Sequence, residues 1–450
     1  MKKIISLALV LLLCLSLLAC NTPPVVTEPS GTGGVGNTGA TDGTETTPPP
    51  VATVPVGIDE VPKPDSLPVS GWRSSNADAT DPYVITESGC YFLYNRCLYF
   101  LDAATGYSVG LCSKPGCLHG EAASRRNCDA YISTSVSMMF LYDETLYYAC
   151  DGEYGLALYA RSQDGLQLRK VGNLNSQYLS QNTSTQINNW VFAYGKLYYR
   201  VEIAEFTKGE DGATIQSDNI YALVMFDLST GKAKELLRSR DELIAIRGAN
   251  EDMVLLWMTR ALRVDEDLSD YEPDKYPAYL RLWHEDGGGV STLCEMPSAD
   301  TNSNLGFANG KHYLFGGSGT KVYAYDFATM TYGESDLPEG VNRIWSEKYA
   351  GVKWEGYYDL ETGTYYTNEY ATMQLPDGVS KFGASPRAFG ENGFVVEESY
   401  SNGYGSIVSL NNIVYIPFEK LNDGFQLSDR ILFMRREDGK EYTLVQPENR

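Results

Sequence analysis

Three cysteines and one histidine lie within 17 residues of one another: Cys112, Cys117, His119 and Cys128, with the spacing Cys-x4-Cys-x-His-x8-Cys. Thiolate sulfur and imidazole nitrogen are preferred zinc ligands, and Cys3His is an established tetrahedral set. The segment therefore predicts a structural zinc site. Four protein ligands leave no position for a water molecule, so the metal would staple a loop rather than catalyse.

Two other states of these cysteines fit the same residues, namely a disulfide within the cluster and unpaired thiols. The chain has nine cysteines. Seven follow the N-terminal segment: Cys90, Cys97, Cys112, Cys117, Cys128, Cys150 and Cys294. An odd number cannot pair completely within one chain. A disulfide is the natural outcome outside the cell in oxidising conditions, so metal, disulfide and unpaired thiols all stay open for the cluster.

No catalytic set of residues emerges from the sequence. The chain has three histidines, and it lacks a Gly-x-Ser-x-Gly nucleophile elbow. Asp265, Asp267 and Asp270 form an acidic insertion that could hold calcium, or that is a solvated loop, since it lacks the pattern of an EF-hand. Carboxylate pairs brought together by folding are invisible here, so enzymatic activity stays open.

Short aromatic strands must position the cluster, and they recur. A strand–turn–strand motif recurs at Phe92–Phe100, Phe140–Tyr148, Phe192–Tyr199 and Phe307–Leu314. A strand followed by a polar turn recurs at Leu101–Gly106, Phe226–Gly231, Tyr325–Thr329 and Tyr358–Gly363, with Asp-Gly variants at 164–165, 286–287 and 438–439. Asn, Asp and Gly stand where a hairpin turn needs positive φ.

Two hairpin turns per unit of about 50 residues predict four strands per unit, which is typical of a β-propeller. We expect an all-β fold of seven four-stranded blades, with six to eight compatible with the pattern. Insertions lengthen blades three and four around 208–217 and 263–277. Since a closed ring usually shares a blade between its ends, we expect Tyr83–Thr86 to pair near Tyr442–Val445.

The N-terminus has the pattern of a secretory signal, in which Lys2 and Lys3 precede an apolar run from Ile4 to Ala19. The run ends in Leu17-Leu18-Ala19-Cys20, which resembles the lipobox of bacterial lipoproteins. The resemblance implies that Cys20 receives a diacylglycerol and becomes the mature N-terminus. The alternative is an ordinary signal peptide cut nearby.

The signal pattern, the lipobox resemblance and the composition together divide the chain into three expected parts. These are a signal peptide over 1–19, a lipidated cysteine with a Thr-, Pro- and Gly-rich tether over 20–65, and a propeller over 66–450. We therefore expect a protein on the outer face of the cytoplasmic membrane, attached through the lipid on Cys20. The formal net charge is -22, so nucleic acid is an unfavourable partner.

Leu98–Gly106 resembles the repeat of quinoprotein-type propellers, but the closing tryptophan of that repeat is missing from every copy. The lipobox, tether, Tyr-rich blades and cysteine cluster together resemble the uncharacterised β-propeller lipoproteins of anaerobic Firmicutes. This resemblance implies fold and location and no activity. We expect a binding or scaffold module for an extracellular protein or glycan. The alternatives are a glycan-active hydrolase or lyase, and a subunit of an envelope complex.

Overall fold

The computed structural model describes residues 58–75, 83–119, 127–163, 165, 167–266, 276–285, 289–296, 304–316, 321–352, 356–367, 370, 380–401, 408–421, 425–437 and 440–449. The chain divides into residues 1–50 and 51–450, and all described residues belong to the second unit. Cys20, the expected signal peptide and most of the expected tether lie outside the described residues. Within the described part of the chain, no helix has the length and apolar character that crossing a membrane requires.

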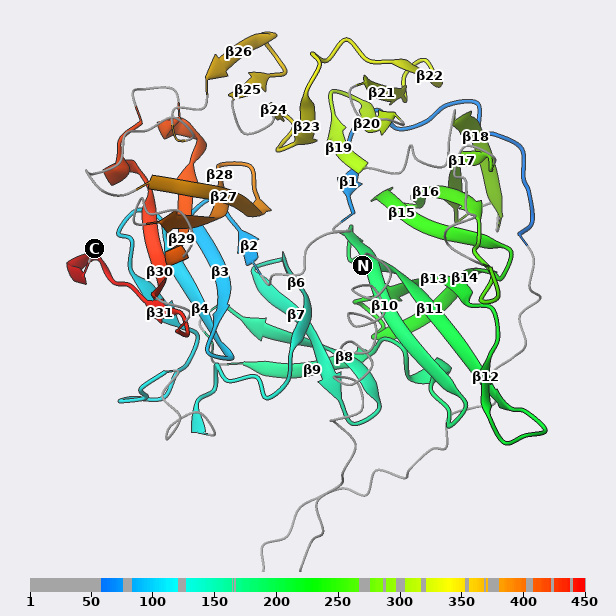
Figure 1. The fold of residues 1–450 in the computed structure, drawn as a ribbon, viewed down its shortest axis with the longest axis horizontal. Helices are drawn as coiled ribbons and strands as arrows, with labels where there is room; N and C mark the ends of the chain where they lie inside the picture. The colour runs from blue at the N-terminus through cyan, green and yellow to red at the C-terminus, as the bar shows by residue number, and fades with distance from the viewer. Residues whose placement is uncertain are drawn as a thin grey trace, which may run out of the picture. The chain divides into compact units, whose positions relative to one another are not determined.

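The described strands form seven antiparallel sheets, which are the blades of a β-propeller (Figure 1). Blade one contains β2 (Tyr83–Ile85), β3 (Gly89–Tyr94), β4 (Cys97–Asp102) and β5 (Ser108–Gly110). Blade two contains β6 (Val136–Tyr142), β7 (Thr145–Gly152), β8 (Gly155–Ser162) and β9 (Leu168–Asn173). Blade three contains β10 (Thr183–Ala193), β11 (Lys196–Lys208), β12 (Thr214–Gln216), β13 (Ile220–Asp227) and β14 (Lys232–Ser239).

The remaining four blades follow in chain order. Blade four contains β1 (Arg73–Ser74), β15 (Glu242–Asn250), β16 (Met253–Arg260), β17 (Ala278–His284) and β18 (Val290–Met296). Blade five contains β19 (Asn304–Ala308), β20 (Lys311–Gly316), β21 (Lys321–Asp326) and β22 (Thr331–Glu334). Blade six contains β23 (Val341–Ile344), β24 (Tyr349–Val352), β25 (Gly356–Asp359) and β26 (Thr364–Thr367). Blade seven contains β27 (Ser380–Phe389), β28 (Gly393–Ser401), β29 (Val408–Pro417), β30 (Ile431–Glu437) and β31 (Thr443–Leu444). Short 3-10 turns lie at η2 (Ser176–Tyr178), η5 (Phe418–Lys420), η6 (Leu427–Asp429) and η7 (Pro447–Asn449).

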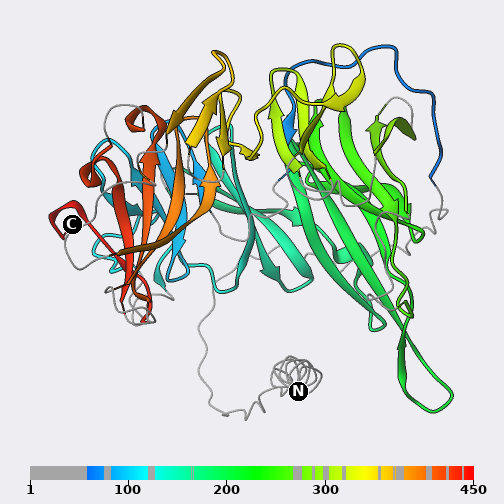
Figure 2. The ribbon, with the colours of Figure 1, turned by 45° about the horizontal axis from the view of Figure 1, so that its top comes forward.

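The prediction of a seven-bladed all-β propeller is confirmed. The expected insertion in blade three is the hairpin of β11 with β12, which projects from that blade in Figure 2. Aromatic side chains fill the contacts between and within blades. One example is Trp345, whose ring centroid lies 5.4 Å from that of Phe394 and 5.8 Å from that of Phe418.

The predicted turn chemistry is also found. Asn95 and Arg96 connect β3 to β4 with φ of 49° and 62°, which is the two-residue turn that matches strand twist. In the second motif, Asp102 Oδ1 accepts hydrogen bonds of 2.9 Å from the N–H groups of Ala104 and Thr105. Asp326 and Asp359 make the same contacts in blades five and six. The aspartate thus closes the turn by replacing a backbone acceptor.

The aromatic hairpin of the first motif does not occupy the same position in every blade. The aromatic hairpin joins the first and second strands in blades two, three and five. In blade one it joins the second and third strands, β3 and β4, because β2 precedes them. Any pair of strands in a blade can use the same two-residue turn, so the motif identifies a hairpin without giving its position in the blade.

The expected pairing of the chain ends is wrong. β2 pairs with β3 of its own blade, and β31 pairs with β30. The ring closes instead by contacts between complete blades one and seven. The amide side chain of Gln446 pairs with the backbone of Ser108 in β5, through bonds of 3.0 and 2.9 Å. Phe433 packs against Phe92 at 4.9 Å.

A segment near the N-terminus packs along blade four. We call residues 58–75 the strap. Its first part pairs with the outer strand β18 through Val61 N–H and Val290 C=O at 3.1 Å, and its end, β1, pairs with the inner strand β15. Between them, Trp72 stacks on Phe327 at 4.7 Å. Residues 59–61, which the sequence assigns to the tether, thus contact the edge of blade four.

Candidate functional site

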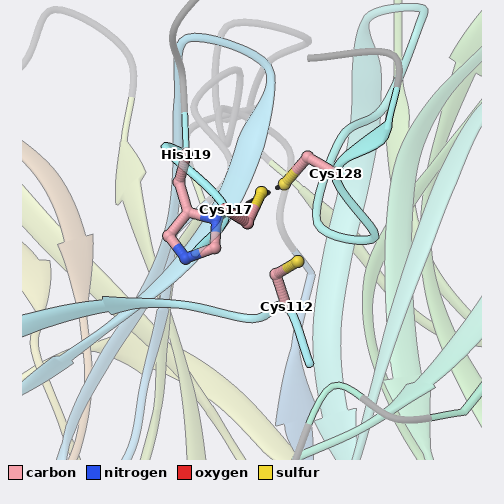
Figure 3. A group of neighbouring side chains, drawn as sticks. All are labelled: Cys112, Cys117, His119 and Cys128. Atoms are coloured by element: carbon pink, nitrogen blue, oxygen red, sulfur yellow. Dashed lines mark hydrogen bonds between the residues drawn. The ribbon is translucent and has the colours of Figure 1, made fainter. Parts of the chain in front are cut away.

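The predicted Cys3His cluster is assembled in the connection between blades one and two. Cys112 and Cys117 follow β5, and Cys128 precedes β6. Their sulfur atoms and the ring of His119 converge on one point in Figure 3. Cys128 is buried, and the other three side chains are partly buried. The structure records Cys112, Cys117 and Cys128 as thiols, with no disulfide joining them.

The distances within the cluster suit a tetrahedral metal ion. All four candidate ligand atoms lie within 4.8 Å of one another, and Cys128 Sγ lies 3.5 Å from His119 Nδ1. Zinc–sulfur bonds of about 2.3 Å place ligand atoms on a tetrahedron about 3.8 Å apart. The residues present therefore fit zinc after a contraction of about 1 Å or less.

A tight turn brings the first two cysteines together. Cys117 N–H donates to Lys114 C=O at 3.3 Å, and Gly116 has φ of +70°. Pro115 and Gly116 thus occupy the central positions of a turn in which proline fixes the first φ and glycine supplies the second. This is the role that the sequence predicts for the pair.

A buried arginine holds the two halves of the cluster. Arg161 on β8 is 1% exposed. Its guanidinium donates to Leu111 C=O at 2.6 Å, next to Cys112, and to Asp129 C=O, next to Cys128. Asp129 N–H in turn donates to Cys112 Sγ at 3.4 Å. Arg161 therefore orients the backbone on both sides of the candidate ligands.

His119 lies against the glycine that ends β5. A Cβ atom added to Gly110 would lie 2.7 Å from His119 Cδ2, which is too close for any side chain. The ring of Tyr99 meets the imidazole edge to face at 6.2 Å. A residue without a side chain at position 110 is thus required for the observed position of His119.

The thiols of Cys112 and Cys117 differ in acidity. Burial opposes ionisation of Cys112, but hydrogen bonds from the N–H groups of Lys114 and Asp129 and from neighbouring thiols lower its pKa below the ordinary value. Burial raises the pKa of Cys117 to about 12, with further contributions from Cys128 and Cys112. A cation at the centre would offset the repulsion between adjacent thiolates.

Sequence reasoning found the four candidate ligands and missed the residues that support them. Arg161, Gly110 and Tyr99 lie outside the Cys/His motif and carry no local signal of their role. Asp265 of the expected calcium site lies in the described loop, whereas Asp267 and Asp270 lie outside the described residues. His312 is fully buried and stacks on Phe307 with ring centroids 4.6 Å apart.

A cavity of about 1330 Å³ lies along the propeller axis. The inner strands of all seven blades line it, from β2 in blade one to β27 in blade seven. Its charged lining residues are Arg200, Arg247, Arg343, Arg387, Glu87 and Glu391. We call this cavity the central channel.

No protein-family profile and no curated protein sequence matches the chain. Solved structures resemble it at low identity. Dipeptidyl peptidase 4 of Porphyromonas gingivalis matches over 81% of this chain and 60% of its own, with 10% identity and a TM-score of 0.42. Oligogalacturonate lyase of Vibrio parahaemolyticus matches over 81% and 97%, with 12% identity and a TM-score of 0.43. TolB of Acinetobacter baumannii matches over 80% and 79%, with 12% identity and a TM-score of 0.32. This chain spans less than two thirds of the dipeptidyl peptidase, and likenesses this distant carry no functional argument.

Proposed function

We propose that this chain is a lipid-anchored propeller of the cell surface that binds an extracellular ligand in its central channel. The observation that carries the proposal is the channel itself, whose volume of about 1330 Å³ exceeds that of ordinary small-molecule pockets. It is lined by all seven blades, so it is a property of the closed ring.

The anchor rests on the sequence. Lys2, Lys3, the apolar run and Cys20 together match a lipoprotein signal. Residues between Cys20 and the strap supply a Thr- and Pro-rich spacer that would hold the propeller away from the lipid surface. Two or more acyl chains would make the attachment durable.

Binding is tested by incubating the purified full-length chain with envelope material from which lipids have been extracted. The proposal predicts saturable retention that excess unlabelled protein competes away. Retention that rises linearly with protein concentration would count against a specific binding function. Membrane attachment is tested separately, by mass spectrometry of the N-terminal peptide that begins at Cys20.

The proposed role of the Cys3His cluster is a zinc staple between blades one and two. Cys112, Cys117, His119 and Cys128 would be the ligands. Metal analysis of the full-length chain should find about one zinc per molecule. The Cys117→Ser variant should lose it, while Cys294→Ser, a partly buried cysteine outside the cluster, should keep it. Fewer than seven free thiols among the cysteines that follow Cys20, together with no metal, would establish a disulfide instead.

A glycan-active enzyme remains the second candidate, because two carboxylates line the channel. Glu87 and Glu391 stand on the turns after the inner strands of the neighbouring blades one and seven. Paired carboxylates are the requirement of glycoside hydrolysis. Release of new sugar ends from envelope glycan, abolished in the Glu391→Gln variant, would favour this candidate over simple binding.

A further inference from the structure

Six of the seven inner strands contain a β-bulge at the same step, between the first and second strands of the blade. The register shifts by one residue at each of these places. The extra residues at these places are Ser137, Asn189, Arg247, Leu305, Asn342 and Arg387, and β27 has a further shift near its start, between Lys381 and Gly383. All six line the central channel. We call them the bulge ring.

A bulge leaves one residue unpaired and re-aims its side chain, and bulges are frequent beside binding sites. Here the same device recurs around the axis, mostly at polar residues, although Asn189, Arg247 and Leu305 are buried. Two arginines, two asparagines and a serine belong to the ring, and Leu305 is its apolar member. Asn342 and Ser137 are exposed to the channel.

The channel has the opposite charge balance to the chain. Arg200, which is not in the ring, and Arg343, beside Asn342, bring the lining to four arginines and two glutamates. The chain as a whole has a net charge of -22. Arginines outnumber glutamates in the lining, which favours an anionic ligand over a cationic one.

Aromatic faces hold two of these cations in place. The guanidinium of Arg247 lies 5.2 Å from the ring centre of Trp257, and that of Arg343 lies 4.7 Å from Phe389. Such stacking limits the rotamers of a long side chain, so less freedom is lost when it binds an anion. Arg387, in contrast, is paired with Glu397, and part of its charge is neutralised.

We infer that the exposed members of the bulge ring, Ser137 and Asn342, bind an anionic carbohydrate chain inside the channel together with the neighbouring Arg343. Arginine pairs with carboxylate or phosphate oxygens through two parallel hydrogen bonds, and asparagine and serine exchange hydrogen bonds with hydroxyl groups. A volume of about 1330 Å³ favours several sugar units over one. The inference rests on the proposed binding function and adds the chemical class of the ligand.

The test is calorimetric binding to the full-length chain in detergent. Three probes are compared: a hexuronic-acid trisaccharide, the same trisaccharide with its carboxylates reduced to alcohols, and a phosphorylated trisaccharide. Arg343→Gln is the test variant, because this arginine is exposed and its loss leaves the core intact. Arg169→Gln, on the outermost strand of blade two and exposed, is the matched control.

At least one charged probe should bind, more weakly as salt rises from about 0.05 to about 0.5 M. Arg343→Gln should weaken that binding about tenfold or more, and Arg169→Gln should leave it unchanged. Tighter binding of the carboxylated or of the phosphorylated probe shows which of the two groups carries the negative charge of the ligand.

Equal binding of the reduced and acidic trisaccharides would overturn the inference while leaving the channel as a binding site. Failure of both charged probes to bind, with envelope retention intact, would overturn it in the same way. If the wild-type chain shows no saturable retention on envelope material, the proposed binding function itself is contradicted.

Discussion

Asn189 of blade three binds the backbone of Ile246 in blade four at both polar groups. Its Nδ2 donates to Ile246 C=O at 3.0 Å, and its Oδ1 accepts from Ile246 N–H. The side chain of a bulge residue thus supplies a backbone-like link between adjacent inner strands. Asn189 has φ of 51°, a conformation that asparagine tolerates better than most residues.

Removing this link between blades three and four should destabilise the propeller. Asn189→Gly keeps the backbone conformation and leaves the two buried groups of Ile246 without partners, so we expect a loss of about 1–3 kcal/mol in the free energy of unfolding. Asn189→Ala should cost about 1 kcal/mol more, because alanine resists positive φ. Denaturant unfolding measures both, with exposed Asn182→Ala as the control. Equal stability of Asn189→Gly and wild type would show that the link contributes nothing.

The hydrogen bonds from Arg161 to the backbone beside Cys112 and Cys128 should govern the affinity of the cluster for a metal ion. Arg161→Lys keeps the charge but not the planar fork that spans Leu111 C=O and Asp129 C=O. Losing support of this kind around metal ligands typically lowers affinity about 10–100-fold. Competition with a chromophoric zinc chelator measures the change, and Arg169→Lys on β9 is the control. Unchanged affinity would mean that the ligand loop holds its own geometry.

His312 should make stability depend on pH. Burial, helped by repulsion from Arg247, holds the pKa of its imidazole well below the usual value, whereas an unfolded histidine titrates near about 6.5. Below that pH the unfolded chain takes up a proton that the folded chain does not. Stability therefore falls as pH falls, by up to about 1.4 kcal/mol per pH unit.

The histidine contribution is isolated by comparing unfolding free energies at about pH 7.5 and about pH 5.5. His312→Gln should lose less stability on acidification than wild type. His284→Gln is the matched control, since His284 is only partly buried and contacts Ser291 at 3.3 Å. An identical loss in wild type and His312→Gln would contradict the assignment.

Local chemistry explains which features could be predicted from the sequence. Turns such as Asn95-Arg96 are set by neighbouring residues, so hairpins and blade number follow from the repeats. The Cys3His group is likewise contained in one loop. Closure through Gln446 and Ser108 joins residues 338 positions apart, and no local pattern specifies it. The bulges have no local signal either, because a register shift depends on both strands.

The proposed ligand site is tested most directly by a substitution that fills the central channel and leaves its charge unchanged. Ser137→Trp places a large ring at an exposed bulge position in the channel, and Thr214→Trp places the same ring on the outer hairpin strand β12. Thermal unfolding first checks that both full-length variants have the same midpoint. Their retention on lipid-free envelope material is then measured. If the ligand binds in the channel, Ser137→Trp should lose saturable retention and Thr214→Trp should keep it. Full retention by Ser137→Trp would contradict a ligand site in the central channel.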